Sequence, residues 1–198
     1  IISDGTDTYS TYSGGRVLVD RSNPYEVTLV SPSDGDTVGK SPTFVWNSNG
    51  GDSVEMSKYR LEISSNVGFT QIIFTDTINV SEPVLSQYSD TMVTELSTSD
   101  TRLYWRVRGI DSAGRINSGT SVRNIWIDAT SPNSPTLSSP ADNSDTSSMR
   151  PYFVWGGGAD NAGGSGRKNY VIEIGGDSLF STVDVRDTRV AANYTSDT

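Results

Sequence analysis

The stretch Leu103-Tyr104-Trp105-Arg106-Val107-Arg108 decides the fold, because large apolar residues alternate along it with tyrosine and arginine. Successive side chains of a β-strand point to opposite faces, so this period of two places the leucine, the tryptophan and the valine on one face. The tyrosine and the two arginines then point to the other face. The stretch predicts a strand with one face in a core and the other toward solvent.

The same alternation recurs elsewhere in the chain. Tyr59–Ile63 reads apolar, charged, apolar, charged, apolar, and Tyr170–Ile174 repeats most of this pattern. Phe44 and Trp46 also lie two residues apart, on one face of a strand predicted over Pro42–Trp46. We therefore predict that Trp46, and Trp155 at the matching place further on, are core tryptophans between two sheets.

Turn residues separate these segments at short intervals. Glycine, proline, asparagine and aspartate gather between them, and no segment shows sustained apolar spacing at helical period. Residues 86–96 are the least strand-like stretch, and one helical turn is an alternative there. About seven short strands in about 100 residues predict an all-β fold made of antiparallel β-sandwiches.

Internal repetition indicates more than one such domain. Leu29-Val30-Ser31-Pro32 recurs as Leu137-Ser138-Ser139-Pro140, 108 positions along the chain. The Phe-Val-Trp of residues 44–46 recurs at 153–155, and Tyr59–Ile63 recurs at 170–174. The offset grows from 108 to 111 only within polar, glycine-rich stretches, where loops accept insertions.

A third, partial copy lies at the front. Residues 17–20 followed by Pro24 match residues 125–128 followed by Pro132. We therefore expect a terminal strand region of a preceding domain over 1–23, a complete sandwich over 24–130, and the first part of a second, truncated sandwich over 131–198. The second copy lacks a counterpart of residues 103–107. More chain, or a strand from another subunit, is expected to cover its open sheet edge.

These motifs resemble bacterial fibronectin type III-like domains. The shared elements are Ser-Pro at 31–32, Phe-x-Trp at 44–46, Tyr-x-Leu-x-Ile at 59–63, Tyr-Trp-Arg-Val-Arg at 104–108 and Asp-x-x-Gly at 111–114. The resemblance implies tandem fibronectin type III or immunoglobulin-like sandwiches of large cell-surface or filament proteins. Leu103 stands where such domains often carry a corner tyrosine, which leaves the choice between the two subfamilies open.

Composition argues against several kinds of chemistry. The 198 residues include no Cys and no His, which excludes disulfides, thiolate metal sites and Ser-His or Cys-His nucleophile pairs. The net charge of −9 disfavours nucleic acid, and no apolar run is long enough for membrane insertion. We expect that the chain is not an enzyme and that it binds no cofactor, and we retain weak Ca²⁺ binding as an alternative. The aspartates in or near loops are Asp111, Asp128, Asp142, Asp145, Asp160 and Asp177.

Several residues are candidates for contacts with a partner. Tyr104 and Trp126 are predicted to face outward, and exposed aromatic side chains anchor partners or stack on sugars. We favour a neighbouring domain or subunit, or a cross-strand pair, as the reason for them, because the sequence shows no cluster of three aromatic residues. The glycine-rich loop 156–166 is either a binding tip or a solvated connection. Asn79 and Asn193 begin glycosylation sequons.

Together these features predict a non-catalytic structural or adhesive repeat segment of an extracellular surface or filament protein. Its partners would be neighbouring domains or subunits of the same protein, with glycans as a second class. The alternative is a glycan- or protein-binding accessory module of a secreted multidomain enzyme. A hydrolase is a third hypothesis, and it requires a deep cleft with two carboxylates.

Overall fold

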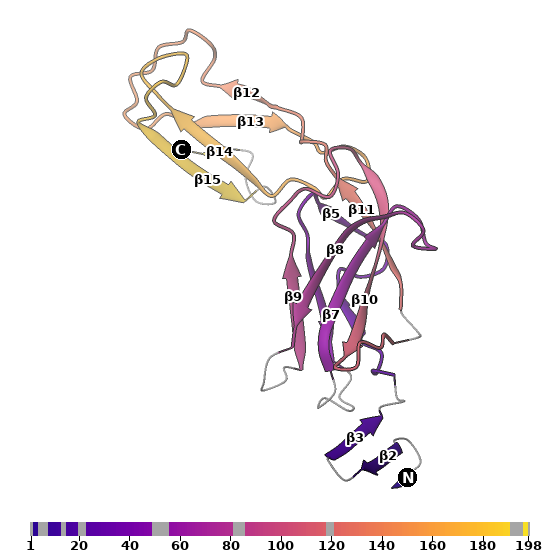
Figure 1. The fold of residues 1–198 in the computed structure, drawn as a ribbon. Coiled ribbons are helices and arrows are strands. Elements are labelled where there is room, and N and C mark those ends of the chain that lie inside the picture. The colour runs from indigo at the N-terminus through magenta and orange to yellow at the C-terminus, as the bar shows by residue number, and fades with distance from the viewer. Residues whose placement is uncertain are drawn as a thin grey trace. The chain divides into compact units, whose positions relative to one another are not determined.

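The computed structural model describes residues 2–3, 8–12, 15–19, 23–48, 56–80, 86–117, 121–190 and 196–197 (Figure 1). The chain divides into two compact units, Ile1–Ala129 (unit 1) and Thr130–Thr198 (unit 2). The regular elements among the described residues are all strands. Within that part of the chain, no helix is long and apolar enough to span a bilayer.

Unit 1 contains two sheets that form a sandwich. The smaller sheet has the order β4-β6-β9 and is antiparallel throughout. The larger has the order β5-β11-β10-β7-β8, in which β5 and β11 run parallel and the other neighbours run antiparallel. The strands are β4 Thr28–Ser31, β5 Asp36–Gly39, β6 Thr43–Asn47, β7 Met56–Ser64, β8 Ile72–Asn79, β9 Gln87–Thr91, β10 Thr101–Asp111 and β11 Arg123–Asp128.

The core of unit 1 is built from alternate strand positions. Phe44 of β6 and Trp105 of β10 are fully buried, and their ring centroids are 4.9 Å apart. Trp46 of β6 lies 5.9 Å from Tyr59 of β7, and Tyr59 lies 4.7 Å from Tyr88 of β9. Each of these contacts joins one sheet to the other, so the rings hold the two layers together. The prediction that Trp46 is a core tryptophan is confirmed.

The helical-turn alternative for residues 86–96 is wrong, because β9 occupies Gln87–Thr91. Tyr88 is buried there against Trp46, and its neighbours in the strand are exposed or half-buried. The polar composition of the stretch concealed a strand with one buried residue. Tertiary packing of that residue and pairing with β6 decide the conformation.

A small antiparallel sheet precedes the sandwich strands in sequence. It has the order β1-β2-β3, with β1 Ile2–Ser3, β2 Thr8–Tyr12 and β3 Gly15–Val19. β3 overlaps the segment 17–20 that matches 125–128, and its assignment to a preceding domain stays a prediction.

Unit 2 contains a sheet of order β12-β13-β16 and a β14-β15 pair. The bounds are β12 Pro135–Ser139, β13 Phe153–Gly157, β14 Asn169–Ile174, β15 Val185–Val190 and β16 Ser196–Asp197. Trp155 is buried 5.6 Å from Tyr170, as Trp46 is from Tyr59 in unit 1. Phe180 has a positive φ of 50°, close to the 53° of its counterpart Phe69.

Matching side chains of the two units differ in exposure. Leu29 is 3% exposed in unit 1, whereas Leu137 is 77% exposed in unit 2. Ile63 is fully buried and Ile174 is 37% exposed. In unit 1, β10 and β11 supply the inner residues Leu103, Trp105, Val107, Ile125 and Ile127. The described strands of unit 2 include no counterpart of β10 or β11, which explains why Leu137 and Ile174 are exposed.

A candidate interaction face on unit 1

The outward side of the larger sheet of unit 1 gathers cationic and aromatic side chains. Because side chains alternate, the residues between the core positions of β7, β10 and β11 all point to this side. We call it the outer face, and it consists of Lys58, Arg60, Glu62, Arg102, Tyr104, Arg106, Arg108, Asn124 and Trp126. Five of these side chains are cationic and one is a carboxylate.

Tyr104 and Trp126 are both on the outer face. Arg102 pairs with Trp126 and Tyr104 pairs with Asn124, so the two aromatic side chains are diagonal neighbours on adjacent strands. Trp126 is 41% exposed, whereas Tyr104 is half-buried. The Arg102 guanidinium carbon lies 4.6 Å from the Trp126 ring centroid, so this cation occupies one side of the indole. A sugar stacking on that side would have to displace it.

Glu62 is the anionic centre of the outer face. Its side chain is 6% exposed and accepts a 2.6 Å hydrogen bond from Arg106 Nε. Its other oxygen is 3.1 Å from Arg60 Nε, and Arg108 Nε is 3.6 Å from the oxygen that Arg106 contacts. Three guanidinium groups therefore share one carboxylate, which leaves this cluster with two uncompensated positive charges.

Arg108 shows the effect of this excess. Partial burial lowers the pKa of its guanidinium, and the positive charges of Arg106 and Arg60 lower it further against the opposing effect of Glu62. The field around Arg108 is thus short of negative charge. An added carboxylate beside it would stabilise its charged form.

A folded loop covers one end of the cluster. Asn66 Oδ1 accepts the Thr70 backbone N–H at 3.1 Å, and Asn66 Nδ2 donates to Thr70 Oγ1 at 2.9 Å. This turn presents Phe69, whose ring centroid is 3.9 Å from the Arg106 guanidinium carbon. Phe69 and Glu62 together fix the position of Arg106, so the guanidinium is held in place before any partner arrives.

A pair of carboxyl groups lies at the edge of unit 1, and sequence reasoning did not predict it. Asp76 on β8 pairs with the core residue Leu61, and Asp90 on β9 pairs with the core residue Phe44. Both aspartates therefore point inward at the open edges of the two sheets, where their carboxyl groups meet. Burial raises the pKa of Asp90, and the charge and hydrogen bond of Asp76 raise it further. We call Asp76 and Asp90 the acidic edge.

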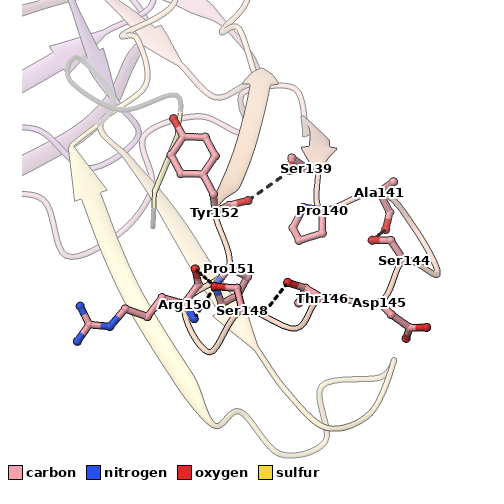
Figure 2. Close-up of a pocket in the computed structure, with 10 residues that line it drawn as sticks. All are labelled: Ser139, Pro140, Ala141, Ser144, Asp145, Thr146, Ser148, Arg150, Pro151 and Tyr152. Atoms are coloured by element: carbon pink, nitrogen blue, oxygen red, sulfur yellow. Dashed lines mark hydrogen bonds between the residues drawn. The ribbon is translucent and has the colours of Figure 1, made fainter.

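Unit 2 contains a pocket of about 440 Å³ beneath the loop 139–152. Figure 2 shows that the side chains of Asp145 and Arg150 point away from it. The Ser144 hydroxyl donates to the Ala141 carbonyl, and the Ser148 hydroxyl donates to the Arg150 carbonyl, so lining polar groups are used inside the loop. No carboxylate pair of the kind that hydrolysis requires lines this pocket.

The candidate Ca²⁺ ligands are dispersed. In the part of the chain that the structure describes, no three Asp or Glu residues lie close enough together to hold a metal ion. Asp111 is buried and accepts the Arg115 N–H at 2.7 Å, whereas Asp177 is half-buried and accepts a hydrogen bond from Ser181 Oγ at 2.7 Å. These carboxylates act as caps of local turns.

The remaining sequence candidates are the glycine-rich loop of unit 2 and two asparagines, of which Asn79 pairs with Lys58 of the outer face. In the loop 156–166, Asp160 accepts the Gly166 N–H at 2.6 Å and the Asn161 N–H at 3.0 Å, which ties the loop to itself. Asn79 is exposed at the end of β8. Asn193 lies outside the described residues. Binding by the loop and glycosylation at Asn79 stay predictions.

The outer face could be anticipated from the sequence only in part. Alternation in residues 102–108 indicates that the arginines share a side with Tyr104. The sharing of Glu62 by three arginines depends on the register of β7 against β10, which sequence does not reveal. The acidic edge depends likewise on the proximity of two edge strands that belong to different sheets.

No family model and no curated protein matches the sequence. Among solved structures, CopC from Methylosinus trichosporium OB3b is 19% identical with a TM-score of 0.36, over 52% of this chain and 93% of that one. The fibronectin(III)-like modules of Clostridium thermocellum CbhA are 16% identical with a TM-score of 0.36, over 83% of this chain and 74% of theirs. The FN1-FN3 domains of chicken CNTN1 are 16% identical with a TM-score of 0.41, over all of this chain and 64% of that one.

These likenesses are distant, so the fold of unit 1 is assigned from its own strands. A three-stranded antiparallel sheet faces a five-stranded sheet, and β5 runs parallel to β11 at the edge of the larger one. Aromatic side chains from both layers fill the space between them. Unit 1 is thus an all-β sandwich of the fibronectin type III and immunoglobulin-like kind.

Proposed function

We propose that this chain is a non-catalytic structural or adhesive segment of an extracellular surface or filament protein. The observation that carries the proposal is that each unit is built around its own buried tryptophan–tyrosine pair, Trp46 with Tyr59 and Trp155 with Tyr170. A chain assembled from such units gains length by adding more of them. Pro132 and Pro135 in the joining segment restrict its backbone, as expected of a spacer.

The distribution of polar groups supports a role without catalysis. The sequence has no His and no Cys, and the pocket of unit 2 has no opposed carboxylates. The conspicuous chemistry of the described residues lies instead on a flat sheet face and a sheet edge, both of which are shapes suited to contact with other macromolecules.

The alternative is a glycan- or protein-binding accessory module of a secreted enzyme. Outward-facing Trp126 and Tyr104 favour it, while the position of Arg102 against the indole opposes sugar stacking there. A glycan array separates the two functions. An accessory module should bind a glycan, and the substitution Trp126→Ala should abolish that binding. We expect no glycan to bind.

Surface location is tested on the source cells. Antibodies raised against the chain should label intact cells as strongly as permeabilised ones. Labelling that requires permeabilisation would contradict an extracellular role. Specific glycan binding that requires Trp126 would contradict the structural function and support the accessory module instead.

A further inference from the structure

The outer face and the rest of the chain carry opposite charge. Five cations and one carboxylate give the outer face a net charge of +4 in a chain whose net charge is −9. Setting these six residues aside leaves 10 Lys and Arg against 23 Asp and Glu, from totals of 15 and 24. A cationic patch on an otherwise acidic molecule is complementary to other surfaces of the same molecule.

The acidic edge supplies such a complementary surface. Asp76 and Asp90 hold two carboxyl groups side by side at the open edge of the sandwich, and the ion pairs between described residues include neither of them. Two copies cannot pair edge to edge there without placing four carboxyl groups together. Inward-pointing charge of this kind protects an edge strand from such pairing. Asp76 is exposed and Asp90 is half-buried, so this edge can meet a cationic sheet face through Asp76 first.

We propose that the outer face of unit 1 binds the acidic edge of unit 1 in a second copy of this chain. The interface is heterologous, since a different surface is used on each copy, and each copy keeps one free surface of each kind. Successive copies can therefore add in one direction. The inference deepens the proposed structural function, on which it rests, by naming its partner.

The size of the outer face sets the expected strength. Its three strands cover roughly 30 by 14 Å, from a rise of about 3.4 Å per residue and a strand spacing of about 4.8 Å. That area is at the small end of specific interfaces, so the contact is weak in solution and effective only where copies are concentrated. Arg102 and Arg106 are already held against aromatic rings, which reduces the entropy lost when a partner binds.

Sedimentation equilibrium of the whole 198-residue chain tests the association. We expect self-association at about 20 mM NaCl that weakens at least about tenfold at about 500 mM, because salt screens exposed charges. Arg102→Gln with Arg108→Gln should weaken it at least about tenfold. The control is Lys40→Gln with Arg150→Gln, which changes the net charge by the same amount at sites outside the outer face. This control should change the association constant less than about twofold.

A variant of the acidic edge distinguishes the proposed interface from general charge repulsion. Asp76→Asn with Asp90→Asn lowers the net negative charge, so general repulsion between acidic chains predicts stronger association. The proposed interface predicts weaker association, by at least about tenfold. Circular dichroism of every variant establishes that it folds. A wild-type chain that stays monomeric at low salt, or edge and control variants that behave alike, would overturn the proposal.

Cross-linking tests which surfaces meet. The chain has no Cys, so Tyr104→Cys on the outer face and Ser89→Cys beside the acidic edge each introduce a single thiol. In a mixture under mild oxidation, disulfides between the two variants should outnumber those within either variant several-fold at low salt. Random pairing in an equal mixture gives about twice as much of the mixed product as of either other product, and a yield no higher than that would overturn the proposal. Binding of dextran sulfate to the outer face by a chain that does not self-associate would also overturn it.

Discussion

Replacing Glu62 by glutamine should destabilise unit 1 strongly, because this carboxylate is the shared partner of three guanidinium groups. Two unit charges about 4 Å apart attract by about 4 kcal/mol at an effective dielectric constant of about 20. Removing one partner of a buried ion pair costs about 3–5 kcal/mol. The arginine side chains here are 14–31% exposed, which reduces the loss toward the lower bound. We expect unit 1 to lose about 3 kcal/mol of its free energy of unfolding.

Unit 2 contains a matched control for this substitution. Glu173 occupies the place that Glu62 has in unit 1, yet its side chain is 34% exposed and pairs only with Arg186, at 2.5 Å, among the ion pairs described. Glu173→Gln should therefore cost unit 2 less than about 1 kcal/mol. The two carboxylates differ in how many guanidinium groups surround them and in how far water is excluded.

Native-state hydrogen exchange measures both units in one molecule. Amides of β7 and β10 report opening of unit 1, and amides of β14 report opening of unit 2. In the Glu62→Gln chain, protection should fall in β7 and β10 and stay unchanged in β14. A loss below about 1 kcal/mol in unit 1, or equal losses for the two substitutions, would refute the reasoning that the shared carboxylate organises the outer face.

Four further predictions concern ionisation and packing. The raised pKa of Asp90 means that its charged form destabilises the fold, so stability falls as pH rises through that pKa, and Asp90→Asn should raise the melting temperature at pH 7. Burial and the nearby Tyr88 raise the pKa of Tyr59 to about 12, so unit 1 should lose stability between about pH 10 and 12, and phenolate absorbance should show one tyrosine ionising late. Hydrogen bonds from Ser181 and the backbone lower the pKa of Asp177, so the loop it caps should loosen as pH falls through that pKa, seen as faster amide exchange that Asp177→Asn removes. Strands of unit 2 should exchange faster than their counterparts in unit 1, because Leu137 and Ile174 are exposed where Leu29 and Ile63 are buried; equal protection in the two units would contradict this.

The sequence by itself determined the all-β class, the faces of the main strands and the core tryptophans. Alternation in residues 59–63 and 103–108 indicates which side chains are inside, because a strand in a sandwich has one buried face and one solvated face. The repeat of Phe-Val-Trp located Trp46 and Trp155, both of which are buried. These features are local, since they depend on residues close together in the chain.

Only the tertiary structure decided what the polar residues do. Strand β9 escaped prediction because one buried residue, Tyr88, fixes it through contacts with Trp46 and Tyr59. The gathering of three arginines around Glu62 depends on the register between β7 and β10, whose paired residues are 44 positions apart at Glu62 and Arg106. The acidic edge depends on two sheets ending side by side. Register and layer packing are set by contacts between distant segments, and alternation within one strand carries no information about them.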